Sequence, residues 1–142
     1  MCWVGRLGVG TLEGVGGGVV ANFYEETMAT ITTHVLDTAA GRPAAGVQYR
    51  LERIAPGPRE EVARGVTNAD GRCDGPLLRE GGVGTYELHF EVAAYFAGQG
   101  IALTEPPFLD VVTLRFGVAA LEGHYHVPLL MTPWSYSTYR GS

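Results

Sequence analysis

The stretch Thr30–Asp37 reads TITTHVLD, and its pattern decides the fold class. The residues form two alternating sets, with Ile31, Thr33 and Val35 in one and Thr32, His34 and Leu36 in the other. A period of two places the sets on opposite faces of an extended chain. Gly41 and Pro43 then interrupt the pattern. The stretch therefore predicts a β-strand that begins the regular part of the chain.

Segments of the same character recur between turn signals along the rest of the chain. They are Gly46–Ile54, Glu60–Thr67, Tyr86–Phe90, Phe108–Val118, His124–Met131 and Trp134–Arg140. The Ala-rich spacing after Phe90 instead predicts two helical turns that stop at Gly98. About eight short strands with one helix indicate an all-β domain of two packed antiparallel sheets. Periodicity alone does not separate such a sandwich from a closed barrel.

Composition restricts the class of protein further. The 142 residues are 46% hydrophobic and carry a net charge of −5, which is typical of one soluble globular domain. The acidic balance argues against a nucleic-acid partner, and no apolar run reaches the ~18 residues of a membrane span. Only Cys2 and Cys73 occur, which argues against a disulfide scaffold. A reducing, cytoplasmic location is therefore predicted.

The first 27 residues differ from the remainder. Glycine dominates them, and they show neither strict alternation nor a helical apolar stripe. We therefore predict a disordered Gly-rich leader over residues 1–27, with Met28 as an alternative start, and a single domain over residues 28–142.

The four histidines are not equivalent. His124 and His126 lie two residues apart, so both side chains leave the same face of their strand. His34 could meet this pair if the two strands converge. His89 lies between Glu87 and Glu91 and is interpreted as a solvated surface residue.

Two chemistries fit three converging histidines. His34, His124 and His126 could hold a catalytic zinc ion with one position open for water. Without metal, one imidazole could take a proton from water while Arg72 or Arg140 stabilises the negative charge that develops on a carbonyl oxygen. The residues alone leave both possibilities open.

Four segments carry a resemblance to a known family: THVLDTAAGRPA (residues 33–44), TNADGR (67–72), HYHVPLL (124–130) and YRGS (139–142). The chain resembles the transthyretin-like family in its 5-hydroxyisourate hydrolase branch, from about Ala29 to Ser142. The resemblance implies a transthyretin-like sandwich of two antiparallel four-stranded sheets with one short helix. It also implies a homotetramer, built as a dimer of dimers, with active sites in a channel between dimers.

The same resemblance implies an activity and a site. The activity is hydrolysis of 5-hydroxyisourate to 2-oxo-4-hydroxy-4-carboxy-5-ureidoimidazoline in urate catabolism, with no cofactor and no metal. The implied catalytic residues are His34, Arg72 and His126. The implied substrate-binding residues are His34, Arg72, His124, Tyr139 and Ser142. A non-catalytic carrier of small ligands and a zinc hydrolase remain as alternatives.

Overall fold

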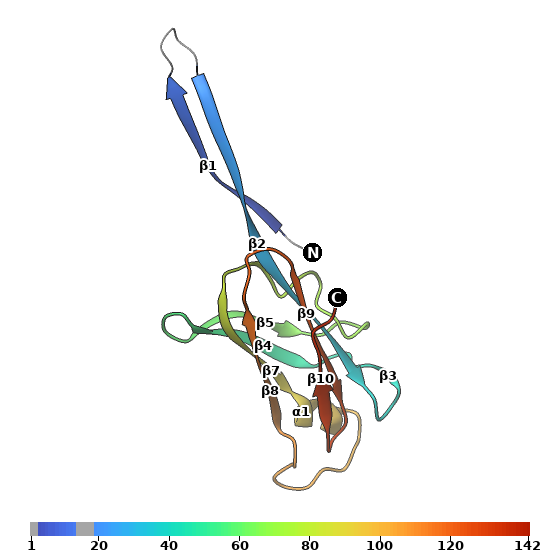
Figure 1. The fold of residues 1–142 in the computed structure, drawn as a ribbon. Coiled ribbons are helices and arrows are strands. Elements are labelled where there is room, and N and C mark those ends of the chain that lie inside the picture. Colours follow the sequence, from blue (N-terminus) through green and yellow to red (C-terminus); the bar gives the residue numbers. More distant parts are fainter. Residues whose placement is uncertain (1–2, 14–18) are drawn as a thin grey trace.

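The computed structural model describes residues 3–13 and 19–142, with side chains from Ala29 onward (Figure 1). The strands are β1 (Trp3–Glu13), β2 (Val19–Asp37), β3 (Arg42–Pro43), β4 (Gln48–Ala55), β5 (Glu60–Val66), β6 (Leu78–Gly81), β7 (Gly84–Glu91), β8 (Val111–Val118), β9 (His124–Met131) and β10 (Tyr136–Thr138). The one helix of the described residues is α1 (Val92–Gly98), where the sequence predicts it.

The strands form two sheets. One sheet has the order β1-β2-β9-β10, with β3 and β6 also paired to β2, and the other has the order β5-β4-β7-β8. The predicted all-β architecture of two sheets and one short helix is confirmed. Two details differ from the predicted pair of four-stranded antiparallel sheets. The first sheet contains six strands, and β2 and β9 run parallel to each other.

The predicted alternation in β2 is confirmed by burial. Ile31 and Val35 are fully buried between the sheets, whereas Thr32 and His34 are half-buried on the other face. The neighbouring strand β9 follows the same rule, with Tyr125, Val127 and Leu129 facing the core. The largest buried side chains include Tyr86, Phe90, Phe96, Leu51 and Leu88. Their removal from water is the main stabilising contribution to the sandwich.

Helix α1 is fixed to β2 by one buried polar contact. The Tyr95 hydroxyl donates a hydrogen bond to Oδ2 of Asp37 at 2.8 Å, and the backbone N–H of Ala40 donates to Oδ1. Burial and then the Asp37 carboxylate raise the pKa of Tyr95 to about 12, so the phenol keeps its proton and remains a donor. The contact holds α1 against the end of β2.

Part of the predicted leader is described as strand. Trp3–Glu13 pairs antiparallel with Val19–Met28, and the two strands form a ribbon that extends away from the sheets (Figure 1). An antiparallel ladder satisfies backbone N–H and C=O groups whatever the side chains are. These two strands therefore form although their side chains do not alternate between polar and apolar. Strand β2 also crosses the predicted boundary at residue 28. Residues 1–2 and 14–18 of the leader lie outside the described residues.

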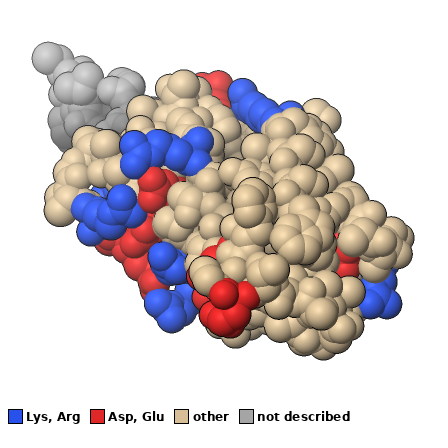
Figure 2. All heavy atoms as spheres, turned by 90° about the horizontal axis from the view of Figure 1, so that it is seen from below, with Lys and Arg blue, Asp and Glu red and all other residues tan. Residues whose placement is uncertain are grey.

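The prediction for His89 is wrong. This side chain is 7% exposed on the outer face of the second sheet, with Nδ1 bonded to Thr113 and Nε2 to Glu52. Glu52 and Glu87 also pair with Arg59, and Glu87 pairs with Arg115. Figure 2 shows basic and acidic groups side by side along the left of the molecule, in accord with such paired charges.

No helix among the described residues is long and apolar enough to cross a membrane.

Candidate active site

Two strands supply the histidines of the site. In the parallel pairing of β2 with β9, Thr30 lies opposite His124 and Thr32 lies opposite His126. Residues two apart on a strand share a face, so the two imidazoles lie on the face that also carries Thr32. This face looks away from the core, and it is the face that the sequence predicts for the pair.

A tight turn brings Arg72 to the same place. The side-chain oxygen of Asn68 accepts hydrogen bonds from the backbone N–H groups of Asp70 and Arg72, at 2.9 and 3.1 Å. Gly71 has φ +74, and its carbonyl oxygen accepts a hydrogen bond of 2.8 Å from the backbone N–H of Val35. A side chain at position 71 would overlap the Val35 carbonyl oxygen. Glycine is therefore required both by the positive φ and by the lack of space. The turn thereby pairs Arg72 with His34 across an antiparallel bridge.

The last residues of the sequence close the site from another side. The backbone N–H of Gly141 donates a hydrogen bond of 2.8 Å to the carbonyl oxygen of His126. Gly141 lies directly over the His126 ring, where an added Cβ would be 2.5 Å from ring atom Cδ2. The segment after β10 thus packs against the imidazole and leaves no room for a side chain at residue 141.

These elements enclose a cavity of about 420 Å³. Its walls are formed by Thr32, Thr33, Arg72, Cys73, Gly75, Pro76, His124, His126 and Ser142. Four of the six predicted site residues therefore line one cavity: Arg72, His124, His126 and Ser142. His34 stands beside it, two residues along β2 from Thr32 and paired with Arg72.

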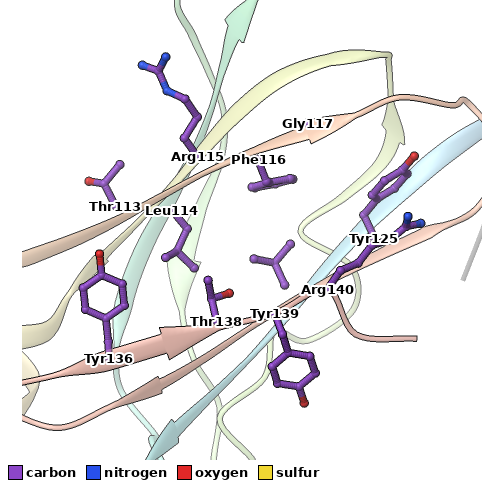
Figure 3. Close-up of a pocket in the computed structure, with 11 residues that line it drawn as sticks. Thr113, Leu114, Arg115, Phe116, Gly117, Tyr125, Tyr136, Thr138, Tyr139 and Arg140 are labelled. Atoms are coloured by element: carbon purple, nitrogen blue, oxygen red, sulfur yellow. The ribbon is translucent and has the colours of Figure 1, made fainter.

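Tyr139 is, besides His34, the other predicted site residue that does not line this cavity. Its side chain is 60% exposed and borders a second hollow of about 400 Å³ between the edges of β8 and β10. Figure 3 shows this hollow, with Leu114, Phe116 and Tyr125 among its walls and Arg140 lying against Tyr125. The Arg140 guanidinium carbon is 4.4 Å from the centre of the Tyr125 ring. Arg140, the alternative oxyanion donor, is therefore engaged outside the histidine cavity.

The cavity favours neutral imidazoles beside an arginine. Burial lowers the pKa of His126 below its ordinary value of 6.5, and the nearby charges of Arg72, His124 and His34 lower it further. Burial also lowers the pKa of His34 and of His124. No carboxylate side chain is among the described residues that line the walls. The site thus combines uncharged proton acceptors with an arginine cation.

Thr32 is the contact that the sequence analysis did not identify. Its Oγ1 lies 2.6 Å from Nε2 of His124 and 2.8 Å from Nδ1 of His126. The alternation of β2 places Thr32 on the face of His34, but the register between β2 and β9 decides that it reaches both histidines. Cys73 and Pro76 of the cavity wall were also missed, and no signal in the sequence distinguishes them.

The donors of the cavity do not form a compact metal-binding set. Among the side chains of residues 29–142, the one group of three His, Cys, Asp or Glu ligand atoms within 4.8 Å of one another is Glu52, Glu87 and His89, on the outer face of the second sheet. His34, His124 and His126 do not meet this distance, and Thr32 already occupies one nitrogen of each of the last two. The geometry favours proton transfer over zinc ligation.

Comparison with known proteins places the chain in a family. Residues 31–141 match the model described as "Transthyretin: HIUase/Transthyretin family". Over 114 residues the chain is 62% identical to the 5-hydroxyisourate hydrolase of Deinococcus radiodurans, covering 79% of this chain and 95% of the relative. The chain belongs to the HIUase/Transthyretin family.

Two solved structures have the same fold. The Klebsiella pneumoniae 5-hydroxyisourate hydrolase aligns with a TM-score of 0.69 and 36% identity, over 81% of this chain and all of the other. Sea bream transthyretin in complex with thyroxine aligns with the same TM-score and 32% identity, over 79% and 94%. The fold is thus similar to that of a 5-hydroxyisourate hydrolase and to that of a transthyretin solved in complex with thyroxine.

Proposed function

We propose that this protein hydrolyses 5-hydroxyisourate to 2-oxo-4-hydroxy-4-carboxy-5-ureidoimidazoline, a step of urate degradation. One observation carries the proposal: the cavity joins neutral His126 to the cationic Arg72 in a chain 62% identical to a hydrolase of that name. A neutral imidazole is a general base, and a guanidinium stabilises an oxyanion.

The arrangement supports a specific division of roles. Nδ1 of His126 faces Thr32, so Nε2 is the nitrogen left to take a proton from water. The activated water attacks an acyl carbon of the six-membered ring, and the ring C–N bond then breaks. Arg72 can give two parallel hydrogen bonds to the oxygen-rich edge of the substrate, including the oxygen that becomes negative. Among residues 29–142, no carboxylate lies within 4.0 Å of its guanidinium to compete.

His34, His124, Ser142 and Tyr139 complete the proposed site. Burial and then the charges of Arg72 and His124 lower the pKa of His126, and His34 adds to this effect and so helps to keep the base neutral. His124 and Ser142 lie in the cavity wall and can contact the substrate. Tyr139 lies in the neighbouring hollow, so its proposed contact with the substrate ring requires assembly of subunits.

The proposed assembly is a homotetramer in the cytoplasm. Strands β8 and β10 each end a sheet, so each has backbone groups free to pair with another chain. Exposed aromatic residues lie in or within three residues of these strands, among them Phe108, Trp134, Tyr136 and Tyr139. Sedimentation or light scattering in solution measures the mass, and a monomer at micromolar concentration would contradict the assembly. The free thiol of Cys73 is in keeping with a reducing compartment.

The test is turnover of the unstable substrate. Urate oxidase generates 5-hydroxyisourate in the cuvette, and its ultraviolet absorbance decays slowly without catalyst. We expect the purified protein to accelerate this decay catalytically, at concentrations far below that of the substrate, and equally after treatment with a strong chelator. Binding without acceleration would indicate a carrier, and loss of activity on chelation would indicate a zinc hydrolase.

A further inference from the structure

The hydroxyl group of Thr32 bridges the two histidines of the cavity. It is 2.6 Å from Nε2 of His124 and 2.8 Å from Nδ1 of His126, both within hydrogen-bonding distance. A threonine hydroxyl has one proton to donate and two lone pairs to accept with. It can therefore donate to one imidazole while it accepts from the other, but it cannot donate to both.

This stoichiometry couples the tautomers of the two rings. If Nδ1 of His126 donates to Thr32, then Thr32 donates to Nε2 of His124, and both rings carry their proton on Nδ1. If the chain of hydrogen bonds is reversed, both rings carry their proton on Nε2. Only the first state leaves Nε2 of His126 unprotonated and able to act as a base.

We propose that Thr32 is a positioning residue for catalysis, whose hydroxyl holds His126 in the tautomer with a basic Nε2 and relays a proton from His126 to His124. The inference rests on the proposed hydrolase function of the same cavity. It adds a role for His124, which lines the cavity beside His126 at a ring-to-ring distance of 6.1 Å.

Each proton that moves in the proposed step has a donor and an acceptor. Nε2 of His126 takes a proton from water as the water oxygen bonds to the acyl carbon. The Nδ1 proton of His126 passes to Thr32 Oγ1, and the Thr32 proton passes to Nε2 of His124. His124 then gives its Nδ1 proton to the ring nitrogen as the C–N bond breaks. Both imidazoles end neutral, with their protons on Nε2, and exchange with solvent restores the first state.

The structure provides a matched set of variants. Thr32→Val keeps the branched shape and removes the hydroxyl, whereas Thr32→Ser keeps the hydroxyl. Thr38→Val is the control, because the hydroxyl of Thr38, directly after β2, also donates a hydrogen bond to β9, at 3.1 Å to the Met131 carbonyl oxygen, outside the cavity. Each variant is measured for kcat and KM between pH 5 and 9, with folding verified by circular dichroism.

We expect Thr32→Val to lower kcat by roughly 100-fold with little change in KM, as for loss of acid–base assistance. Thr32→Ser should restore activity to within about threefold, and Thr38→Val should match the wild type. An active wild type with an equally active Thr32→Val and an unchanged pH profile would overturn the relay and leave the hydrolase function standing. Inactivity of the wild type would instead overturn the proposed function.

The protonation of the ring nitrogens gives a second test, which uses the wild-type protein alone. Nitrogen-15 NMR of the wild type, labelled at histidine, distinguishes protonated from unprotonated ring nitrogens. At pH 8, where both rings are neutral, we expect His124 and His126 to share the tautomer with the proton on Nδ1. Opposite tautomers in the two rings would overturn the proposal, because the two nitrogens beside Thr32 would then be both donors or both acceptors and no relay could run through its hydroxyl.

Discussion

The packing of Gly141 on His126 permits a sharp prediction for Gly141→Ala. The added Cβ would lie 2.5 Å from Cδ2 and 3.1 Å from Cβ and Cγ of His126. Carbon atoms in contact prefer a separation of about 3.5 Å or more, so the ring or the terminal segment must move by roughly 1 Å. The ring cannot move freely, because Nδ1 is bonded to Thr32 and the His126 carbonyl oxygen is bonded to Gly141.

A displacement of this size is expected to reduce kcat/KM by roughly 100-fold, since catalytic geometry tolerates about an ångström of error poorly. The assay is decay of enzymatically generated 5-hydroxyisourate under conditions where substrate is limiting. Gly82→Ala is the matched control, because nothing lies within 4 Å of its added Cβ and its backbone is not strained. Gly82→Ala should retain full activity. Activity of Gly141→Ala within threefold of the wild type would refute the reasoning about this contact.

Three further predictions follow from the site and from the helix contact. Arg72→Lys should lower kcat/KM by at least about tenfold although the charge is kept, because an ammonium group cannot form two parallel hydrogen bonds; full activity would contradict this. The rate should fall as the pH drops through a value below 6.5, because burial, Arg72 and the neighbouring histidines lower the pKa of His126, the proposed base; a midpoint above 6.5 would contradict a neutral base. Tyr95→Phe should lower the free energy of unfolding by about 1–3 kcal/mol in urea titrations, because buried Asp37 loses a donor; an unchanged midpoint would show that the bond contributes nothing.

The lowered histidine pKa values also predict how stability depends on pH. Their folded-state pKa lies below the unfolded value of about 6.5, so the unfolded chain binds protons more readily in this range. The free energy of unfolding should therefore be greatest above pH 6.5 and decrease as the pH falls through the lowered values. Replacing His126 should weaken this dependence.

Local patterns predicted most of the fold. The alternation of Ile31 and Val35 with Thr32 and His34 gave both the strand and its buried face. The helix over Val92–Gly98 was predicted because alternation stops at the point where alanine spacing begins. The parallel pairing of β2 with β9 was not predicted, because partner strands are chosen by contacts distant in sequence. The leader gave no periodic signal for a different reason, since an antiparallel ladder pairs backbone groups whatever the side chains are.

The site was predicted only in part for a related reason. The H-x-H spacing placed His124 and His126 on one face, and the structure brings Arg72 and Ser142 to the same cavity. Thr32 could not be identified, because its contact with both rings depends on the exact register of two strands. His89 was misjudged because its sequence neighbours are glutamates, whereas cross-strand Thr113 and Glu52 enclose it.

The central claim is that His126 is the base of a hydrolase, and one comparison tests it most directly. The decay of 5-hydroxyisourate is followed with equal concentrations of wild type, His126→Ala and His89→Asn, each verified as folded. His89 lies on the outer face of the other sheet and has no part in the proposed site, so its variant controls for loss of an imidazole as such. We expect fast decay with the wild type and His89→Asn, and a rate near the uncatalysed one with His126→Ala. Equal rates for wild type and His126→Ala would contradict the account.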